Sequence, residues 1–394
     1  MDRADVYRST VRHLFAPVAD LLYNDDSVTE VLINGPDQIY CERAGRLEKV
    51  DRRFPDEHAL MAAAQNLAEY VRRRLDDKHH SLDARLPEPE KFRVHVIIPP
   101  TSRVGVCVSI RKFKLADTTL DGLVNDKQSL SAAGSEYLRL MVRAHRNVVV
   151  AGGTGSGKTS LLNALSAAIP AHERVVVIED LSELQLHQEH TVYLEARPAG
   201  PDGKGAVTIR DLFVDSLRMR PDRILVGEVR RGEALDLIQS MLSGHDGSLT
   251  TVHASSPLLA LVRLETLCLM NDVGLPVYVA RTQVASAVHV IAQVARMADG
   301  SRKVVSIAEV MGLGKGDRYR VRELFAFRRT GTDANGKILG SLEPTGKRSR
   351  FADYMRESPV ADEIDLTAPL FAPRAKGSES DSEGDALVIT RSGS

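Results

Sequence analysis

The sequence of 394 residues contains no tryptophan, and aromatic residues make up only 5% of the chain. A core with so few aromatic rings must be built from aliphatic side chains, which suits parallel strands buried between helices. Cysteine is also scarce, and its three positions form no Cys-x-x-Cys pair: Cys41, Cys107 and Cys268. This spacing indicates neither a disulfide framework nor a four-cysteine zinc site, and it fits a reducing cytosol.

Long apolar segments are missing as well. The chain has no run of about 18 apolar residues, and its first ten residues, MDRADVYRST, lack the apolar stretch of a signal peptide. We therefore expect any contact with a membrane to be peripheral.

Neither sign of charge predominates, because 52 lysines and arginines stand against 53 aspartates and glutamates. This balance argues against a protein whose whole surface binds nucleic acid. The charge is nevertheless uneven: residues 357–394 hold eight acidic and three basic side chains, which leaves a net charge of +4 on the preceding residues. This tail is rich in serine, glycine and acid, and we expect it to be disordered.

The pattern of apolar residues predicts a small domain followed by a linker. Residues 1–24 have helical spacing with an interruption at Pro17. Residues 25–115 contain strand-like segments and a helix that begins near Pro55, which predicts an α+β domain. Residues 116–130 are rich in turn-forming and polar residues and are expected to be a linker.

Residues 131–356 alternate helical segments with strands that read as continuous apolar runs, such as NVVVAGG and RVVVIED. Runs of this kind are typical of parallel strands covered on both faces. The expected fold class is therefore α/β, with a largely parallel sheet and helices on both faces.

The strongest motif follows the first of these strands and precedes a helix. It matches the phosphate-binding pattern G-x-x-x-x-G-K-[ST] at Gly152, Gly153, Thr154, Gly155, Ser156, Gly157, Lys158 and Thr159. Glycines allow backbone N–H groups to surround the β-phosphate, and the helix N-terminus adds partial positive charge. We expect Lys158 to reach the β- and γ-phosphates of ATP, and the Thr159 hydroxyl to coordinate Mg²⁺.

Hydrolysis also requires a carboxylate that holds the Mg²⁺ shell and positions or deprotonates water. Glu179 and Asp180 end one apolar strand, and Glu183 lies on the loop beyond it. Glu228 ends another strand, ILVGEV. Ligands bind parallel sheets at the carboxyl ends of strands, although an acid at a strand end is often only a helix cap. We assign water activation and a share of the metal site to Glu228, with Glu183 and Asp180 as partners that hold Mg²⁺ or position water. Glu183 is kept as the alternative catalytic carboxylate.

The segment GHDGSLTTVHA contains His245 and His253, separated by a strand-like stretch. Thr250, Thr251 and His253 could hydrogen-bond the γ-phosphate and report its loss. A single histidine is more often structural, so on the sequence alone both histidines are candidates only.

Four motifs in order resemble the type II/type IV secretion ATPase superfamily in its Walker A, Asp box, Walker B and His box: GGTGSGKTSLLNAL, IEDLSELQL, LRMRPDRILVGEVR and GHDGSLTTVHASSP. The likeness extends over residues 25–330 and looks closest to the CpaF branch, the motors of tight-adherence (Flp) pili. EPEKF after DARLP departs from that family's usual Asp-Gly-Ser type turn. The four-cysteine module of the type II secretion and pilus-extension branches is absent from the sequence.

The resemblance implies a RecA-like motor domain and a hexameric ring, with nucleotide between the N-terminal and motor domains. It also implies that arginines of the N-terminal domain reach the phosphates, at Arg85, Arg93 and Arg111. Guanidinium groups suit the charge of a phosphoryl transition state, although each arginine alone could equally be a surface ion-pair residue.

By resemblance, the protein is a homohexameric, Mg²⁺-dependent ATPase in the cytoplasm at the inner-membrane face. Its expected partners are further copies of itself and inner-membrane platform proteins, and the expected work is assembly of a tight-adherence pilus or related secretion machine, with retraction left open. No nucleic acid is expected. Two alternatives are a nucleotide-gated scaffold with little turnover and a conjugation or DNA-translocation motor, against which the small body charge counts.

Overall fold

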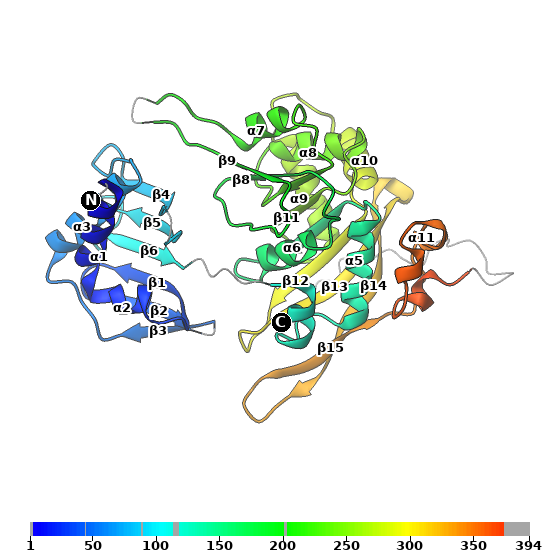
Figure 1. Ribbon diagram of the computed structural model, residues 1–394, viewed down its shortest axis with the longest axis horizontal. Coiled ribbons are helices and arrows are strands. Elements are labelled where there is room, and N and C mark those ends of the chain that lie inside the picture. The colour runs from blue at the N-terminus through cyan, green and yellow to red at the C-terminus, as the bar shows by residue number, and fades with distance from the viewer. Residues whose placement is uncertain (1–2, 44, 88–89, 113–117, 201–202, 374–394) are drawn as a thin grey trace. The chain divides into compact units, whose positions relative to one another are not determined.

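The computed structural model describes residues 3–43, 45–87, 90–112, 118–200 and 203–373. The chain divides into two compact units (Figure 1). The first comprises residues 1–115 and 198–206, and the second comprises the remainder. Within the described ranges, no helix is both long enough and apolar enough to cross a membrane.

The first unit is built on a six-stranded sheet in the order β3-β2-β1-β6-β5-β4, in which every neighbouring pair is antiparallel. The expected break near Pro17 is present, because α1 (Arg3–Leu14) ends before η1 (Ala16–Val18). Asp56 caps α3 (Glu57–Tyr70) by accepting a hydrogen bond from Ala59 N at 2.8 Å. The other elements are α2 (Ala19–Tyr23), β1 (Val28–Asn34), β2 (Ile39–Arg43), β3 (Arg46–Val50), β4 (Ser81–Arg85), β5 (Arg93–Ile97) and β6 (Cys107–Arg111).

The second unit is built on a nine-stranded sheet in the order β15-β14-β13-β12-β7-β11-β10-β8-β9. Neighbours from β12 to β9 are parallel, whereas β13, β14 and β15 extend the sheet in antiparallel fashion. The expected α/β fold with a largely parallel sheet is confirmed. The strands are β7 (Val148–Gly152), β8 (Val175–Glu179), β9 (Thr191–Glu195), β10 (Arg223–Val226), β11 (Leu249–Val252), β12 (Val290–Arg296), β13 (Arg302–Leu313), β14 (Tyr319–Thr332) and β15 (Ile338–Pro344).

Helices cover both faces of this sheet. Val148 and Val150 of β7 belong to the core that includes α5 (Ala132–Arg143) and α6 (Lys158–Ser166). Val149 and Ala151 of the same strand belong to a second core, on the opposite face. Because successive strand residues point to opposite faces, a sheet buried on both sides requires the continuous apolar runs seen in the sequence. The second core is covered by α7 (Ile209–Ser216), α8 (Glu233–Leu242), α9 (Pro257–Leu269) and α10 (Val277–Ala287).

The prediction that residues 116–130 form a linker is wrong in part, because this segment contains the helix α4 (Leu120–Asn125). Thr119 caps this helix by accepting a hydrogen bond from Gly122 N at 3.0 Å. Leu120 and Leu123 are buried in the same core as α5. Two apolar residues three positions apart after a threonine are sufficient for one short buried helix, and residues 116–117 lie outside the described residues.

The expectation of disorder from residue 357 onward is also wrong for residues 357–373. This segment completes α11 (Ala352–Glu357) and forms η3 (Ala361–Glu363) and η4 (Ala368–Phe371). The Phe371 ring stacks on Tyr137 of α5 at a centroid distance of 6.1 Å. The segment orders because its apolar residues are buried against α5, whereas the acidic stretch that suggested disorder lies in residues 374–394, outside the described residues.

Glu136 of α5 fastens this C-terminal segment. Its carboxylate accepts hydrogen bonds from Asp365 N, Leu366 N and Thr367 N at 2.9, 2.9 and 3.0 Å, and from Thr367 Oγ1 at 2.6 Å. Burial by itself raises the pKa of Glu136, but these hydrogen bonds outweigh burial and the pKa is lowered. Because the folded-state pKa lies below the unfolded value of about 4.3, this stabilisation is present above that pH and is lost as the pH falls through the folded pKa.

We expect Glu136→Ala to reduce the free energy of unfolding by about 3 kcal/mol, because several donors to one carboxylate lose their acceptor. Urea unfolding at pH 7 measures this change, and the difference from the wild type should shrink at pH 3. The matched control is Glu363→Ala, which removes partly exposed ion pairs to Arg139 and Arg143 and should cost under about 1 kcal/mol. Equal losses in the two variants would contradict the assignment of Glu136 as the fastening residue.

Candidate active site

The phosphate-binding loop connects β7 to α6. Gly155 and Gly157 have φ values of 67° and 99°, in the left-handed region that favours glycine. Ser156 Oγ donates a hydrogen bond to Gly153 O at 2.8 Å, which closes the loop on itself. The sequence motif therefore has the strand–loop–helix setting that phosphate binding requires.

Lys158 lies inside this loop. Its Nζ donates a hydrogen bond to Gly153 O at 3.1 Å and lies 3.3 Å from His253 Nε2. Burial lowers the pKa of Lys158, and the carboxylate of Glu228 opposes that shift. The ammonium group is thus held at the loop, within the cluster of acids described next.

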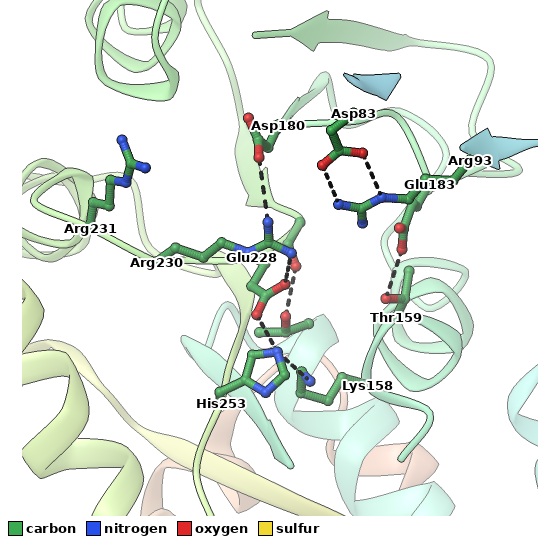
Figure 2. Close-up of polar contacts among 12 residues, drawn as sticks. Asp83, Arg93, Lys158, Thr159, Asp180, Glu183, Glu228, Arg230, Arg231 and His253 are labelled. Carbon is green, nitrogen blue, oxygen red and sulfur yellow. Dashed lines mark hydrogen bonds and ion pairs between the residues drawn. The ribbon is translucent and has the colours of Figure 1, made fainter. Parts of the chain in front are cut away.

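Thr159 and Glu183 form the first contact between the loop and the acids. Thr159 Oγ1 donates to Glu183 Oε2 at 3.4 Å, as Figure 2 shows. The loop that carries Glu183 is held by Glu179, whose Oε1 accepts hydrogen bonds from Glu183 N and Leu184 N at 2.9 and 3.0 Å. Glu179 is only 4% exposed. It therefore supports the loop that carries Glu183 and is not positioned to contact nucleotide.

Glu228 lies two residues beyond the end of β10. Its Oε2 is 2.6 Å from Arg230 Nη2, and its Oε1 is 2.6 Å from His253 Nε2. The second contact is short but is not aligned as a hydrogen bond, and Oε1 is buried without a hydrogen-bond partner in the described part of the chain. Burial lowers the pKa of His253, and the carboxylate of Glu228 opposes that shift. The Glu228 carboxylate is therefore held between Arg230 and His253, with Oε1 buried against the imidazole.

Arg230 is a site residue that the sequence interpretation missed. Its guanidinium lies between Glu228 and Asp180, whose Oδ2 is 3.4 Å from Arg230 Nη1, whereas Arg231 points away from both acids (Figure 2). Glu233 fixes this turn, because its Oε1 accepts hydrogen bonds from Arg230 N and Arg231 N at 2.7 and 2.8 Å. The available signal was an arginine directly after the strand that ends in Glu228.

His245, by contrast, does not belong to this site. β11 runs parallel to β7, with Leu249 opposite Val148 and Val252 opposite Ala151. His253 follows β11, at the carboxyl end of the parallel strands, where the phosphate-binding loop begins. His245 precedes β11 and lies at the amino end of these strands. The physical reason is the strand itself, which separates the two histidines by its whole length, about 13 Å for four residues.

Thr250 and Thr251 are likewise not placed to contact a phosphate. Both are buried, with 0% and 1% of their surface exposed. Thr251 Oγ1 donates to Gly227 O at 2.8 Å and so ties β11 to the residue before Glu228. The Thr251 hydroxyl thus supports the segment that carries Glu228.

In the first unit, the three predicted arginines form one row across three strands. Arg85 of β4 is directly opposite Arg93 of β5, which is directly opposite Arg111 of β6. Residues paired in this way project from the same face of a sheet. Arg93 pairs with Asp83 at 3.1 Å and Arg111 with Glu30 at 3.5 Å.

The described residues contain no group of three or more histidines, cysteines or acids that could hold a metal ion by itself. Mg²⁺ is usually held by one or two carboxylates together with substrate phosphates. Thr159 and Glu183 fit that requirement, since their oxygen atoms already lie together at the end of the loop.

Sequence comparison places the chain among known proteins. The profile of a family described as type II/IV secretion system protein matches residues 13–337. The chain belongs to this family. A putative conjugal transfer protein of Mycobacterium tuberculosis is 37% identical over 297 residues, covering 74% of this chain and 84% of that protein. The type IV secretion system protein PtlH of Bordetella pertussis is 35% identical over 308 residues, covering 71% of this chain and 89% of that protein.

Among solved structures, the ATPase DotB of Legionella pneumophila is similar to this family member with a TM-score of 0.52. The alignment covers 77% of this chain and 80% of DotB at 17% identity. This likeness supports the fold of the family member, in which the phosphate-binding loop and the acids share one edge of the sheet.

Proposed function

We propose that this family member is a homohexameric, Mg²⁺-dependent ATPase that powers assembly of a secretion or pilus machine. The carrying observation is the convergence of Lys158, Thr159, Glu183 and Glu228 at one end of the parallel strands, where Glu228 contacts both Arg230 and His253. Such a site offers cations for phosphates, oxygen ligands for Mg²⁺ and a carboxylate for water.

Each side chain then has a separate task. Lys158 would exchange its hydrogen bond to Gly153 O for hydrogen bonds to phosphate oxygens. Thr159 and Glu183 would hold Mg²⁺, which neutralises phosphate charge when bound. Glu228 Oε1 would exchange its contact with His253 for the attacking water and take the proton of that water, while Arg230 keeps the other oxygen in place. His253 contacts both Lys158 and Glu228, so loss of the γ-phosphate would alter its surroundings first.

The row of Arg85, Arg93 and Arg111 supports a role for the first unit in neutralising phosphate charge. Three adjacent guanidinium groups on one sheet face repel each other, and an anion relieves that repulsion. Asp83 and Glu30 compensate two of them and would have to give way to phosphate.

A finer proposal concerns the machine that this motor serves. The motif resemblance favours a tight-adherence pilus, with inner-membrane platform proteins as partners and the motor in the cytoplasm at the membrane face. The names of the relatives favour a second candidate, a conjugation or type IV secretion motor. Stimulation of ATP hydrolysis by DNA would favour the conjugation motor, and no change on adding DNA would favour the pilus motor.

Steady-state phosphate release from ATP by the purified chain tests the ATPase proposal. We expect continuous release with Mg²⁺ and near-complete loss of release when EDTA is in excess, because the site needs the metal to neutralise phosphate charge. Readdition of Mg²⁺ should restore the rate. Nucleotide binding without release would instead support the scaffold alternative.

A further inference from the structure

Two arginines face each other beside the phosphate-binding loop. β12 runs parallel to β7, with Val294 opposite Gly152, and the chain then turns back into β13. Arg296 at the end of β12 is directly opposite Arg302 at the start of β13, and both residues are exposed. Directly opposed residues of antiparallel strands project from the same face, where like charges destabilise the strand pair. Two arginines at this place make this end of the hairpin electropositive beside the phosphate-binding loop.

Arg302 contacts the phosphate-binding loop directly. Arg302 Nε donates a hydrogen bond to the carbonyl oxygen of Gly155 at 2.8 Å. The Arg302 side chain also crosses the loop, with its Cδ 3.3 Å from the position that a Cβ would take on Gly157. Arg296 reaches the same bend of the loop, since its Nη1 is 3.7 Å from the position that a Cβ would take on Gly155.

The contact to Gly155 fixes the direction of one peptide group. In a trans peptide the carbonyl and the following N–H point in opposite directions. With Gly155 O held by Arg302, Ser156 N is directed away from Arg302 and donates a hydrogen bond to Gly153 O at 3.4 Å within the loop. Arg302 thus stabilises the orientation of this peptide group, and the N–H can serve a phosphate only by leaving Gly153 O.

We propose that Arg302 is a positioning residue for the nucleotide, and that Arg296 and Arg302 together form a second cationic contact for its phosphates. This inference rests on the proposed function and adds nucleotide-binding residues to it. Because ADP and ATP share the phosphates nearest this loop, the pair should stabilise both nucleotides equally, which affects affinity and leaves the chemical step unchanged.

The test is the binding of a fluorescent ADP analogue and of ATP to arginine variants of the full chain. Arg302→Ala should weaken both affinities about tenfold, and Arg296→Ala about threefold, since Arg302 alone combines charge with the loop hydrogen bond. The kcat at saturating ATP should stay within about twofold of wild type while KM rises. The dependence of Kd on salt concentration should flatten in both variants, which a purely structural role would not produce.

Arg318→Ala is the matched control, because it removes one exposed arginine from the turn at the opposite end of β13. Arg302→Lys should restore the salt dependence but only part of the affinity, because lysine keeps the charge without the guanidinium geometry. An unchanged Kd for ADP in the Arg296 and Arg302 double variant, with wild-type ATP hydrolysis intact, would overturn this inference alone. A wild-type protein that bound ADP but released no phosphate would overturn the ATPase proposal alone.

Discussion

Replacing Glu228 by glutamine should reduce kcat for ATP hydrolysis by about a thousandfold or more, while the Kd for ADP stays unchanged. Glutamine has the same shape and can still accept the hydrogen bond that Arg230 donates to Oε2. It cannot take a proton from water. Phosphate release measures the loss, and equilibrium binding of a fluorescent ADP analogue shows that the loop is intact.

Two further variants separate the roles of the acids. Glu183→Gln should raise the Mg²⁺ concentration needed for half-maximal rate, because Glu183 contacts Thr159 at the end of the loop. Asp180→Asn should have a small effect, since Asp180 is exposed and reaches Arg230 only at 3.4 Å. Full activity in Glu228→Gln together with a thousandfold loss in Glu183→Gln would transfer the role of base to Glu183.

Replacing Lys158 by alanine should abolish both nucleotide binding and turnover at millimolar ATP. The ammonium group is the cation held inside the loop by Gly153 O, and no other side chain in the described site occupies that place. Fluorescent ADP binding and phosphate release measure the two losses. The control is Lys315→Ala, which removes an exposed lysine from η2 (Lys315–Asp317), and wild-type hydrolysis by Lys158→Ala would remove the premise of the site.

Much of the motor fold was predictable from the sequence, because its signals are local. A strand buried on both faces reads as a continuous apolar run, and the loop from Gly152 to Thr159 is contiguous. The contact between Glu228 and His253 also follows from topology, because both residues end parallel strands at one edge. The same rule excludes His245, but only after the bounds of β11 are known.

The remaining features depend on partners distant in the chain. Arg302 contacts Gly155 across 147 residues, and nothing in the local sequence around either residue indicates it. The role of Glu179 could also be assigned only from the structure. In the sequence, a buried carboxylate that accepts a hydrogen bond from Glu183 N cannot be told from a catalytic carboxylate, because each is an acid at the end of a strand. The disorder predicted from composition was wrong for residues 357–373, because a few apolar side chains there are buried in the core although the tail as a whole is polar and acidic.

The C-terminal segment has a consequence for the order of events during synthesis. Glu136 and Thr367 are 231 residues apart, and ribosomes add about 5–20 residues per second. Helix α5 therefore waits roughly 10–50 s for the residues that cover it, with the ring of Tyr137 lacking its partner Phe371 throughout. The motor core is completed only when nearly the whole chain has been made, so a ribosome that stalls before residue 365 releases a chain in which Glu136 lacks its donors and Tyr137 lacks Phe371, a target for chaperones and proteases.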